Sequence, residues 1–410
     1  MKKIIFVNTT SFLQEKHGKS LVIKGIVDYF SKLEAVDFKI ISIGVELECY
    51  SNISMPTVNQ ILKNVIFQLL QRKPLQEILY YAPELKRHII NVINNEKPDI
   101  IIFDTMRVGQ YASSINIGKK ILYMDDLYSK RYLRILEAAR KYKITIDATG
   151  NFVNKIPKVL KNFSRQPAVQ KALLAYEISA LLSSEDRAVT IFDTVILISS
   201  REVIELSART LKNNIMSIKP WVERRGGRRS PEPSGQFIIL GDLSVTHNEV
   251  SAYLFLKAIV PRLITELPGV SLLIVGKSAS ARLLDLQKCY PHVIKITGYV
   301  DDLDAVLSTS TALLAPLVFG SGVKIKLMDA MSAGLPIIAT PVALEGVEFR
   351  PGPGFCSEEH FEAYPDHMRA LMDARQNKAA SDDVRQQFNQ YYGQQALALN
   401  YGHVFHLEVL

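Results

Sequence analysis

The sequence predicts an α/β protein with two domains. In both halves of the chain, short apolar and β-branched runs alternate with longer helical patterns, which is typical of parallel sheets joined by crossover helices. The length of 410 residues exceeds the size at which one hydrophobic core stops growing, so two cores are expected. Residues 219–235 interrupt the alternation and are rich in proline, glycine and arginine. This composition indicates a linker between the domains.

Short segments in each half have the pattern of buried strands. The first of them starts with lysines and continues with apolar residues, but Asn8, Thr9 and Thr10 end the run before it reaches the length of a signal-peptide core. The predicted strands are residues 3–8, 38–43, 99–103, 120–124 and 194–199 in the first half, and 236–240, 270–275, 293–296, 312–315 and 336–340 in the second.

Four parts of the chain follow from these boundaries. From Glu358 onward the pattern is polar and helical, and its last part is expected to pack back on one of the two domains, for which the N-terminal domain is a candidate. The predicted parts are an N-terminal domain at 1–218, the linker at 219–235, a C-terminal domain at 236–380 and a helical segment at 381–410.

The composition excludes several classes of protein. With 48% hydrophobic and 22% charged residues, the chain is unlike disordered, collagen-like or disulfide-rich sequences. Its longest apolar runs are about five residues, against the roughly 20 that a membrane-spanning helix needs, so no transmembrane helix is expected. The three cysteines are widely separated and lack CxxC spacing, which indicates neither a disulfide framework nor a zinc site. The protein is therefore expected in a reducing cytosol.

The net charge is modestly positive. The 49 Lys and Arg residues exceed the 41 Asp and Glu residues by 8. This excess is too small and too diffuse for a nucleic-acid binder, but it suits phosphorylated ligands or an anionic membrane. Residues 61–81 have an apolar helical pattern that carries Lys63, Arg72 and Lys73. They predict either a basic amphipathic helix on the inner membrane face or helices packed on the first sheet with a solvated basic face.

The most informative stretch is a glycine turn between a strand and a helix. Residues 320–322, Gly-Ser-Gly, precede a helix predicted over 323–333. Glycines permit close approach of a ligand, and the amide groups at a helix start bind anions. Lys326 and Asp329 share a helix face, so the ammonium can meet a phosphate while the carboxylate accepts hydrogen bonds from ribose hydroxyls. The alternative is an ordinary crossover helix with solvated lysines and an apolar face on the sheet.

These residues resemble a known family. The run GSGVKIKLMDAMSAGLPIIATPVALEGVEF is similar to the donor-binding signature of the group 1 glycosyltransferases, which are retaining enzymes of the GT-B fold that use nucleotide-activated sugars. The resemblance extends upstream through VIKITGYVDDLDAVLSTSTALLAPLVFGSG. In the first half, ILYMDDLYSKRY and FDTVILISSREV resemble acceptor domains of members that build bacterial surface polysaccharides. The resemblance implies two Rossmann-like domains that face each other across a cleft.

The resemblance assigns roles to two residues of the donor side. The family's pair of glutamates corresponds here to Ser321 and Asp329. Asp329 is expected to bind the ribose of the donor. Ser321 stands where the first glutamate meets the hydroxyls of the donor sugar, and it lacks the carboxylate that makes this contact in the family.

The start of the helix is expected to bind the donor phosphates. The resemblance implies that Gly322 and Val323 offer backbone amides and that Lys326 holds the pyrophosphate, with Lys324 as the second choice. Many relatives have an Arg and a Lys after the first strand of this domain, whereas this chain continues from Gly241 with Asp-Leu-Ser-Val-Thr-His-Asn. Gly241 is therefore placed in the donor site without a cation beside it, and the lysines of the helix are expected to meet the phosphate.

In the first domain a glycine after the first strand is a second donor-site candidate. Gly18 lies in the run His-Gly-Lys-Ser, at the place where the family has a glycine-rich loop facing the donor phosphate. The alternative is an ordinary helix start. A Walker phosphate loop is excluded because Leu13 occupies the position that requires a glycine.

Carboxylates at strand ends are the catalytic candidates of the first domain. Asp126 is the first choice and follows Asp125 at the end of a predicted strand. A carboxylate there can orient an acceptor hydroxyl or stabilise an oxocarbenium-like transition state, or it can cap the following helix. Asp104 has the same two interpretations, with Arg107 as its expected ion-pair partner.

No metal or other cofactor is expected. The sequence lacks HEXXH, GxSxG and CxxC motifs and has no GxGxxG after a strand, so the sites that these motifs mark are not predicted. Asp301 and Asp302 resemble a metal-binding pair, but they stand at a predicted helix start, where acidic residues stabilise the helix dipole. His247 is either a polar residue of a helix start or a ligand contact.

The resulting hypothesis is a retaining glycosyltransferase of bacterial surface polysaccharide biosynthesis, such as that of capsule or lipopolysaccharide. It moves a sugar from a nucleoside diphosphate sugar to a saccharide or lipid-linked saccharide, with Asp126 and Lys326 as catalytic residues. It is expected in the cytoplasm, with peripheral contact to the cytoplasmic face of the membrane. Two alternatives stay open: a nucleotide-sugar epimerase on the same fold, and a catalytically degenerate scaffold, which the serine at Ser321 motivates.

Overall fold

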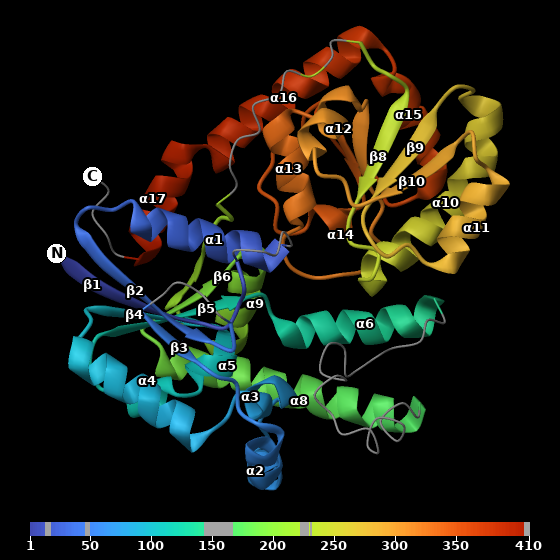
Figure 1. Ribbon diagram of the computed structural model, residues 1–410. Helices are drawn as coiled ribbons and strands as arrows, with labels where there is room; N and C mark the ends of the chain where they lie inside the picture. The colour runs from blue at the N-terminus through green and yellow to red at the C-terminus, as the bar shows by residue number, and fades with distance from the viewer. Residues whose placement is uncertain (13–17, 46–49, 143–166, 222–228, 230–231, 406–410) are drawn as a thin grey trace. The chain divides into compact units, whose positions relative to one another are not determined.

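The computed structural model describes residues 1–12, 18–45, 50–142, 167–221, 229 and 232–405. These residues belong to two compact units, Met1–Ile218 and Lys219–Leu410. Each unit is built on one sheet of parallel strands with helices packed beside it (Figure 1). Within the described part of the chain, no helix has the length and apolar character that crossing a membrane requires.

The first unit contains a parallel sheet with the strand order β3-β2-β1-β4-β5-β6-β7. The chain begins in the middle of the sheet, adds strands on one side, and then returns to add strands on the other. This is the doubly wound order of Rossmann-like domains. The strands are β1 (Lys2–Asn8), β2 (Val36–Ile43), β3 (Ser51–Ile53), β4 (Ile100–Asp104), β5 (Lys119–Asp125), β6 (Thr194–Leu197) and β7 (Ile215–Ser217).

Helices join these strands, and local sequence explains several of their ends. Thr57 and Gln60 form a capping box at the start of the second helix, in which each side chain bonds the other residue's backbone amide. Pro83 stands in the first turn of the fourth helix, where the missing N–H costs no hydrogen bond. The helices are α1 (Gly18–Ser31), α2 (Val58–Leu70), α3 (Leu75–Leu79), α4 (Pro83–Glu96), α5 (Thr105–Gly109), η1 (Ala112–Ser114), α6 (Tyr128–Tyr142), α8 (Pro167–Ile191) and α9 (Ser200–Thr210).

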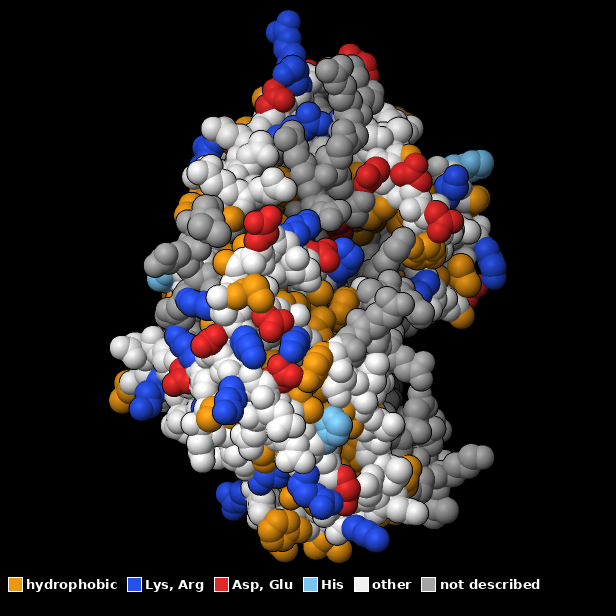
Figure 2. All heavy atoms as spheres, turned by 60° about the vertical axis from the view of Figure 1, so that its left-hand side comes forward, with side chains coloured by type: hydrophobic (Ala, Val, Ile, Leu, Met, Phe, Trp, Pro, Cys, Tyr) orange, Lys and Arg blue, Asp and Glu red, His pale blue; other side chains and the backbone are white. Residues whose placement is uncertain are grey.

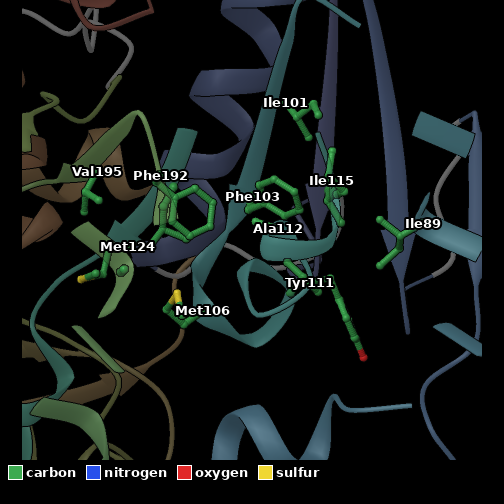
Figure 3. Close-up of a cluster of buried hydrophobic side chains, with 14 of the residues drawn as sticks. Ile89, Ile101, Phe103, Met106, Tyr111, Ala112, Ile115, Met124, Phe192 and Val195 are labelled. Atoms are coloured by element: carbon green, nitrogen blue, oxygen red, sulfur yellow. The ribbon is translucent and has the colours of Figure 1, made fainter. Parts of the chain in front are cut away.

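The central strands of the first sheet are buried on both faces. All of β4 and the last five residues of β1 are buried, as expected for a parallel sheet covered by helices. On one face the side chains of the strands pack with those of the helices around Phe103, Tyr111 and Phe192 (Figure 3). The rings of Phe103 and Phe192 meet edge to face, with their centroids 5.6 Å apart. This packing fixes the strands whose ends carry the polar residues described below.

The second unit repeats the doubly wound order in a parallel sheet, β10-β9-β8-β11-β12-β13. The strands are β8 (Gln236–Leu240), β9 (Ser271–Val275), β10 (Ile294–Gly298), β11 (Ala312–Ala315), β12 (Ile337–Ala339) and β13 (Phe355–Ser357). The helices are α10 (Thr246–Glu266), α11 (Ala281–Cys289), α12 (Leu303–Thr309), α13 (Ile325–Ala333), α14 (Pro341–Leu344), η3 (Phe361–Ala363), α15 (Tyr364–Leu371), α16 (Ala374–Tyr392) and α17 (Gln394–Phe405).

Alternate residues of the central strand enter two different hydrophobic clusters in this unit. Ile238 and Leu240 of β8 pack in one cluster, and Phe237 and Ile239 pack in the other. Because successive side chains of a strand point to opposite faces, the sheet is covered on both sides. The apolar runs predicted as strands are explained by this double burial.

The strands predicted from the sequence are confirmed, with ends that differ by at most two residues. The sequence did not reveal β3, β7 and β13, which are three residues long and lie at sheet edges. Such short strands show no period. The strand predicted to end at Ser199 ends at Leu197, because Ser199 occupies the N-cap position of α9. The helix predicted from Val323 begins instead at Ile325, with Lys324 as its N-cap residue.

The C-terminal part of the chain is helical, as predicted. The expected start of a separate segment at Ser381 lies inside α16, and the hydroxyl of Ser381 donates to the carbonyl oxygen of Gly334 at 2.7 Å. Most of the predicted linker, residues 222–228 and 230–231, lies outside the described residues. Arg229 donates to the carbonyl oxygen of Ser310 at 2.8 Å, which attaches this residue to the second unit. The predicted domain limits stay predictions.

Candidate functional site

In both units, polar residues gather where the two central strands of the sheet end. β1 and β4 in the first unit, and β8 and β11 in the second, are neighbours from which the chain leaves toward opposite edges of the sheet. The loops diverge at such a place, and doubly wound domains bind ligands in the resulting crevice outside the carboxyl ends of the strands. In the second unit Leu240 ends β8 and Ala315 ends β11. The glycine turn follows β11.

Two glycines let the backbones beyond β8 and β9 approach each other closely. Gly241 follows β8 and has a φ of +152°, which residues with a side chain rarely adopt. A Cβ atom on Gly276, which follows β9, would overlap the carbonyl oxygen of Gly241. A Cβ atom on Gly241 would lie 2.9 Å from Cγ of Asn248. The structure thus places Gly241 at the carboxyl edge of the sheet, against the first turn of α10.

A lysine of the glycine turn bonds the turn's own backbone. Lys324 donates from Nζ to the carbonyl oxygens of Ser321 and Gly322, at 2.7 and 2.6 Å. The residue is buried. These bonds hold the turn in shape, and the expected contact of Lys324 with phosphate stays a prediction.

Within the described part of the chain, Lys326 bonds only neutral oxygens. It lies in the first turn of α13 and donates from Nζ to the carbonyl oxygen of Leu240 at 2.9 Å and to Oδ1 of Asn248 at 2.8 Å. Burial, and then the charge of Lys324, lower the pKa of Lys326 from 10.5 to about 7. Among the residues that the structure describes, no carboxylate forms an ion pair with it. A buried amine without an anionic partner is typical of a site that receives an anion.

The remaining predicted donor residues lie on the same turn and helix. Ser321, Gly322 and Val323 are half-buried, and Asp329 is half-buried one turn further along α13 than Lys326. His247, in the first turn of α10, lies beside the turn, with its ring 6.3 Å from that of Phe319. The helix-start position of His247 is confirmed. Contact of any of these residues with a ligand stays a prediction.

In the first unit, a buried ion pair lies at the corresponding edge of the sheet. The fully buried Asp104 ends β4, and Nζ of Lys19 from α1 lies 2.7 Å from its carboxylate. Thr9 and Thr10, which follow β1, donate their hydroxyls to the same carboxylate at 2.7 and 2.8 Å. Burial by itself raises the pKa of Asp104, but the charge of Lys19 and these hydrogen bonds outweigh it and hold the pKa below its usual value.

These contacts correct the capping interpretation of Asp104 and its expected pairing with Arg107, while a role toward an acceptor stays a prediction. The residue stands at the N-cap position of α5, but its side chain makes no capping hydrogen bond. Arg107 does not form the expected ion pair with it and donates instead to Gln76 at 3.4 Å. The carboxylate is already occupied across the sheet by Lys19, Thr9 and Thr10, which the sequence did not suggest.

Gly18 is the first residue of α1, which confirms that it stands at a helix start. The preceding residues of the candidate loop, 13–17, lie outside the described residues. Lys19, the cation of this run, is bonded to Asp104. The expected contact of Gly18 with the donor stays a prediction.

The two acidic residues after the core of β5 have different partners. Asp126 is 2% exposed and forms an ion pair with Arg131 of α6 at 2.5 Å. Asp125 accepts a hydrogen bond from the hydroxyl of Tyr123 at 3.0 Å. Burial, and then the charge of Asp126, raise the pKa of Asp125 to about 6. The pKa of Asp125 is thus closer to neutral pH than that of an ordinary aspartate, and the catalytic role of Asp126 stays a prediction.

The backbone is strained at this edge of the first sheet. Thr105 after β4 and Asp125 at the end of β5 have φ values of +65° and +75°. This region is unfavourable for any residue with a Cβ atom, and more so for a β-branched threonine. Strain of this kind persists where surrounding contacts determine the backbone, and it is frequent at functional sites.

Sequence reasoning missed Asn248. It stands 78 positions from Lys326 and shows no pattern beyond that of a polar residue in the first turn of a helix. The only available signal was its place shortly after the first strand of the second domain, where the family resemblance already pointed to donor binding.

No group of three His, Cys, Asp or Glu side chains that could hold a metal ion is found among the described residues. Asp302 of the Asp301–Asp302 pair accepts from the backbone amide of Ala305 at 2.9 Å. It caps α12, which confirms the helix-start interpretation of this pair.

Comparison with known proteins relates the chain to a glycosyltransferase family and to a bacterial protein. Residues 235–374 match the family described as "Glycosyl transferases group 1". A protein of Klebsiella pneumoniae, named "Uncharacterized 44.6 kDa protein in cps region", is 22% identical over 364 residues, which cover 84% of each chain.

Solved structures share the fold along the whole chain. The lipopolysaccharide outer core galactosyltransferase WaaB has a TM-score of 0.64 at 14% identity, with 99% of each chain covered. A variant of S. aureus TarM in complex with Fondaparinux, alpha-GlcNAc-glycerol and UDP has a TM-score of 0.65 at 10% identity, with 99% of this chain and 100% of TarM covered. Anabaena HepE in complex with UDP and glucose has a TM-score of 0.63 at 12% identity, with both chains fully covered. The fold is the GT-B fold of two Rossmann-like domains.

Proposed function

We propose that this group 1 glycosyltransferase moves a sugar from a nucleoside diphosphate sugar to a saccharide or lipid-linked saccharide, with retention of anomeric configuration. Bacterial surface polysaccharide, such as capsule or lipopolysaccharide, is its proposed product. Two names support this assignment: the relative from Klebsiella pneumoniae is named for a cps region, and WaaB for the lipopolysaccharide outer core. UDP is the first nucleotide to test, because the TarM and HepE complexes contain it.

The observation that carries this proposal is the amine of Lys326, held by neutral oxygens beside the start of α13. In the proposed reaction, the bond between the anomeric carbon and the diphosphate oxygen breaks as the acceptor oxygen bonds that carbon on the same face, and the hydroxyl proton passes to the leaving diphosphate. Negative charge grows on the diphosphate, and Lys326 and the amide groups at the helix start stabilise it. Asp329 accepts hydrogen bonds from the ribose. Since Lys326 supplies positive charge at the phosphates, no bound metal is proposed.

Nucleotide binding is the direct test of this site. We would measure the thermal shift of the full chain with UDP, GDP and ADP and with their glucose conjugates. The expected result is a rise in Tm with one nucleotide, which is abolished in Lys326→Ala and Asp329→Ala. Lys257→Ala is the matched control, because Lys257 is an exposed lysine on α10 and its loss is expected to leave the shift unchanged. A shift that survives in both site variants would place the nucleotide elsewhere.

Product analysis then separates the glycosyltransferase, the epimerase and the scaffold hypotheses. Transfer to an added saccharide, with the anomeric configuration of the donor kept, is the expected outcome. Conversion of the nucleotide sugar into an isomer without any acceptor would favour the epimerase. Nucleotide binding without turnover on any acceptor would favour the scaffold, in line with the missing glutamate at Ser321.

Contact with an anionic membrane through α2 is also part of the proposal. This helix exposes its apolar stripe instead of burying it: Ile66 and Leu70 are 71% and 78% exposed, while Gln68 is buried. Figure 1 shows α2 at the lower end of the first unit, and Figure 2 shows hydrophobic side chains beside Lys and Arg at that end. The alternative, helices packed on the first sheet with a solvated basic face, does not account for the exposed Ile66 and Leu70 of α2, whereas Ile78 of the next helix is buried.

Vesicle binding tests this contact. Ile66→Ser/Leu70→Ser is expected to reduce sedimentation with phosphatidylcholine vesicles that contain about 30% phosphatidylglycerol, because both the apolar area and its basic neighbours contribute to interfacial binding. Ile204→Ser is the control, since Ile204 is equally exposed on α9 of the same unit, at 69%. Equal sedimentation of the parent and the double variant would contradict the proposal, as would equal binding to vesicles without phosphatidylglycerol.

A further inference from the structure

The side chain of Asn248 connects two parts of the proposed donor site. Its Oδ1 accepts from Nζ of Lys326 at 2.8 Å, and its Nδ2 donates to the carbonyl oxygen of Asp242 at 3.0 Å. One end of the amide therefore meets the cation on α13, and the other end meets the loop that leaves β8. Both bonds reach outside its own helix, so the amide links α10 to the two segments that follow β8 and β11.

The fit of this amide depends on glycine at position 241. A Cβ atom there would lie 2.9 Å from both Cγ and Nδ2 of Asn248, which is closer than side-chain atoms pack. Because Gly241 lacks a Cβ atom, the amide can pass over the backbone and reach Lys326. Gly241, which the sequence predicts to lie in the donor site, thus makes room for the side chain of Asn248.

The groups around Lys326 come from three elements. β8 offers the carbonyl oxygen of Leu240, α10 offers Asn248, and the helix of Lys326 itself brings the charge of Lys324. Asn248 is thus the side chain that orients the amine, and the other acceptor is backbone. An amide accepts a hydrogen bond from an ammonium without neutralising its charge, whereas a carboxylate in its place would form an ion pair.

We propose that Asn248 is a positioning residue of the donor site, whose amide aims the Lys326 ammonium at the diphosphate while leaving its positive charge available. The inference rests on the proposed function, because it assumes that a nucleoside diphosphate binds beside Lys326. It goes beyond that function in assigning to a neutral side chain of α10 the orientation of a cation on α13.

The test compares two substitutions of Asn248 with a matched control. Asn248→Ala removes the amide, and Asn248→Asp keeps the shape but places a carboxylate beside the amine. Asn377→Ala is the control. Asn377 is a buried asparagine of the same unit whose amide likewise makes two hydrogen bonds, both to backbone carbonyl oxygens. One of these is on Thr311, which precedes β11 at the opposite edge of the sheet. Calorimetric titration of each full-length protein with UDP, GDP and ADP at pH 7 and pH 9 gives the dissociation constants.

We expect Asn248→Ala to weaken diphosphate binding about tenfold or more at pH 7, the effect of losing one hydrogen bond to a charged group. Asn248→Asp should also bind weakly, because its carboxylate neutralises the ammonium. Its affinity should change less between pH 7 and pH 9 than that of the parent, since an ion pair keeps Lys326 protonated. Asn377→Ala should bind as the parent does, whatever its Tm.

Three outcomes would overturn the inference. If both Asn248 variants bind the diphosphate as tightly as the parent, Asn248 is a structural residue and the proposed function stands. If Asn377→Ala weakens binding as much as Asn248→Ala, the effect reflects general loss of stability. If the parent binds none of the diphosphates, the proposed function fails and the inference fails with it. Asn248→Asp, which is nearly isosteric, decides the matter if the alanine variant does not fold.

Discussion

The carboxyl edges of the two sheets share one strand order but hold positive charge in opposite ways. At the edge of the first sheet, Lys19 is paired with the buried carboxylate of Asp104, and two threonine hydroxyls complete that carboxylate's bonds. At the edge of the second sheet, Lys326 is bonded to a backbone carbonyl and an amide. Lys19 at the first edge thus has an anionic partner, whereas Lys326 at the second has none among the described residues.

The pKa directions follow this difference. Burial lowers the pKa of Lys19, but Asp104 outweighs it and the net change is upward. Burial, and then the charge of Lys324, lower the pKa of Lys326 to about 7, and no carboxylate among the described residues opposes them. Both lysines lie near the carboxyl edge of a parallel sheet. Lys19 stabilises the first unit through its ion pair, whereas the charge of Lys326 in the second unit is available to bind an anion. Strand order alone predicts which edge of a sheet binds ligands. Whether the charged side chains at that edge are available to a ligand depends on their partners within the protein.

The largest expected effect comes from breaking the ion pair of the first unit. Lys19→Met leaves Asp104 buried without its cation, which costs about 3–5 kcal/mol of unfolding free energy. Urea denaturation of the full chain would measure this loss. Lys24→Met, which breaks an exposed pair with Asp28 on the same helix, should change stability by no more than about 0.5 kcal/mol. The double variant Lys19→Met/Asp104→Asn should recover part of the loss. A double variant no more stable than the single one would show that the buried charge is not the cause.

The next prediction concerns the cation of the second unit. Because the pKa of Lys326 falls from 10.5 in the unfolded chain to about 7 in the fold, its contribution to stability is fully present above pH 10.5 and is lost as the pH falls toward 7. Lys326→Met should therefore gain stability relative to the parent, by about 4 kcal/mol, as the pH is lowered from 10.5 to 7. Denaturation curves of both proteins across this range test it. A constant difference would mean that Lys326 keeps its ordinary pKa.

A smaller effect is expected from closing the space between the strand ends of the second sheet. Gly276→Ala places a Cβ atom against the carbonyl oxygen of Gly241, so the backbone beyond β8 or β9 must move. We expect a loss of about 2 kcal/mol in unfolding free energy together with weaker diphosphate binding, because Gly241 adjoins Asn248. Gly269→Ala is the comparison, since nothing lies within 4 Å of its Cβ position, although its φ of +92° adds some strain. Unchanged binding in Gly276→Ala would separate this backbone from the donor site.

The smallest effect is expected at Asp125. Its pKa is raised from 3.8 to about 6, so its contribution to stability is present below pH 3.8 and is lost as the pH rises through 6. Asp125→Asn should become more stable relative to the parent, by about 2 kcal/mol at most, between pH 4 and pH 7. Thermal unfolding at several pH values measures this. If the difference does not vary with pH, the pKa of Asp125 is not raised in the fold.

Much of the fold follows from local sequence. Strands such as β8 and β11 were predicted at their observed bounds, because double burial in a parallel sheet selects continuous apolar runs. The cap of α12 by Asp302 was likewise readable, since a capping side chain bonds amides only a few positions ahead. The glycine turn after β11 and the helix behind it could be read for the same reason, although the helix starts at Ile325.

The partners of the charged residues could not be read in this way. The sequence by itself determined that Lys326, Asp104 and Asp126 stand at helix starts and strand ends. Only the tertiary structure decided that Lys326 bonds Leu240, 86 positions away, and that Asp104 meets Lys19 and Thr9. Periodicity and capping act within a few residues, whereas a buried charge is settled by whichever groups the packed strands bring within about 3 Å of it.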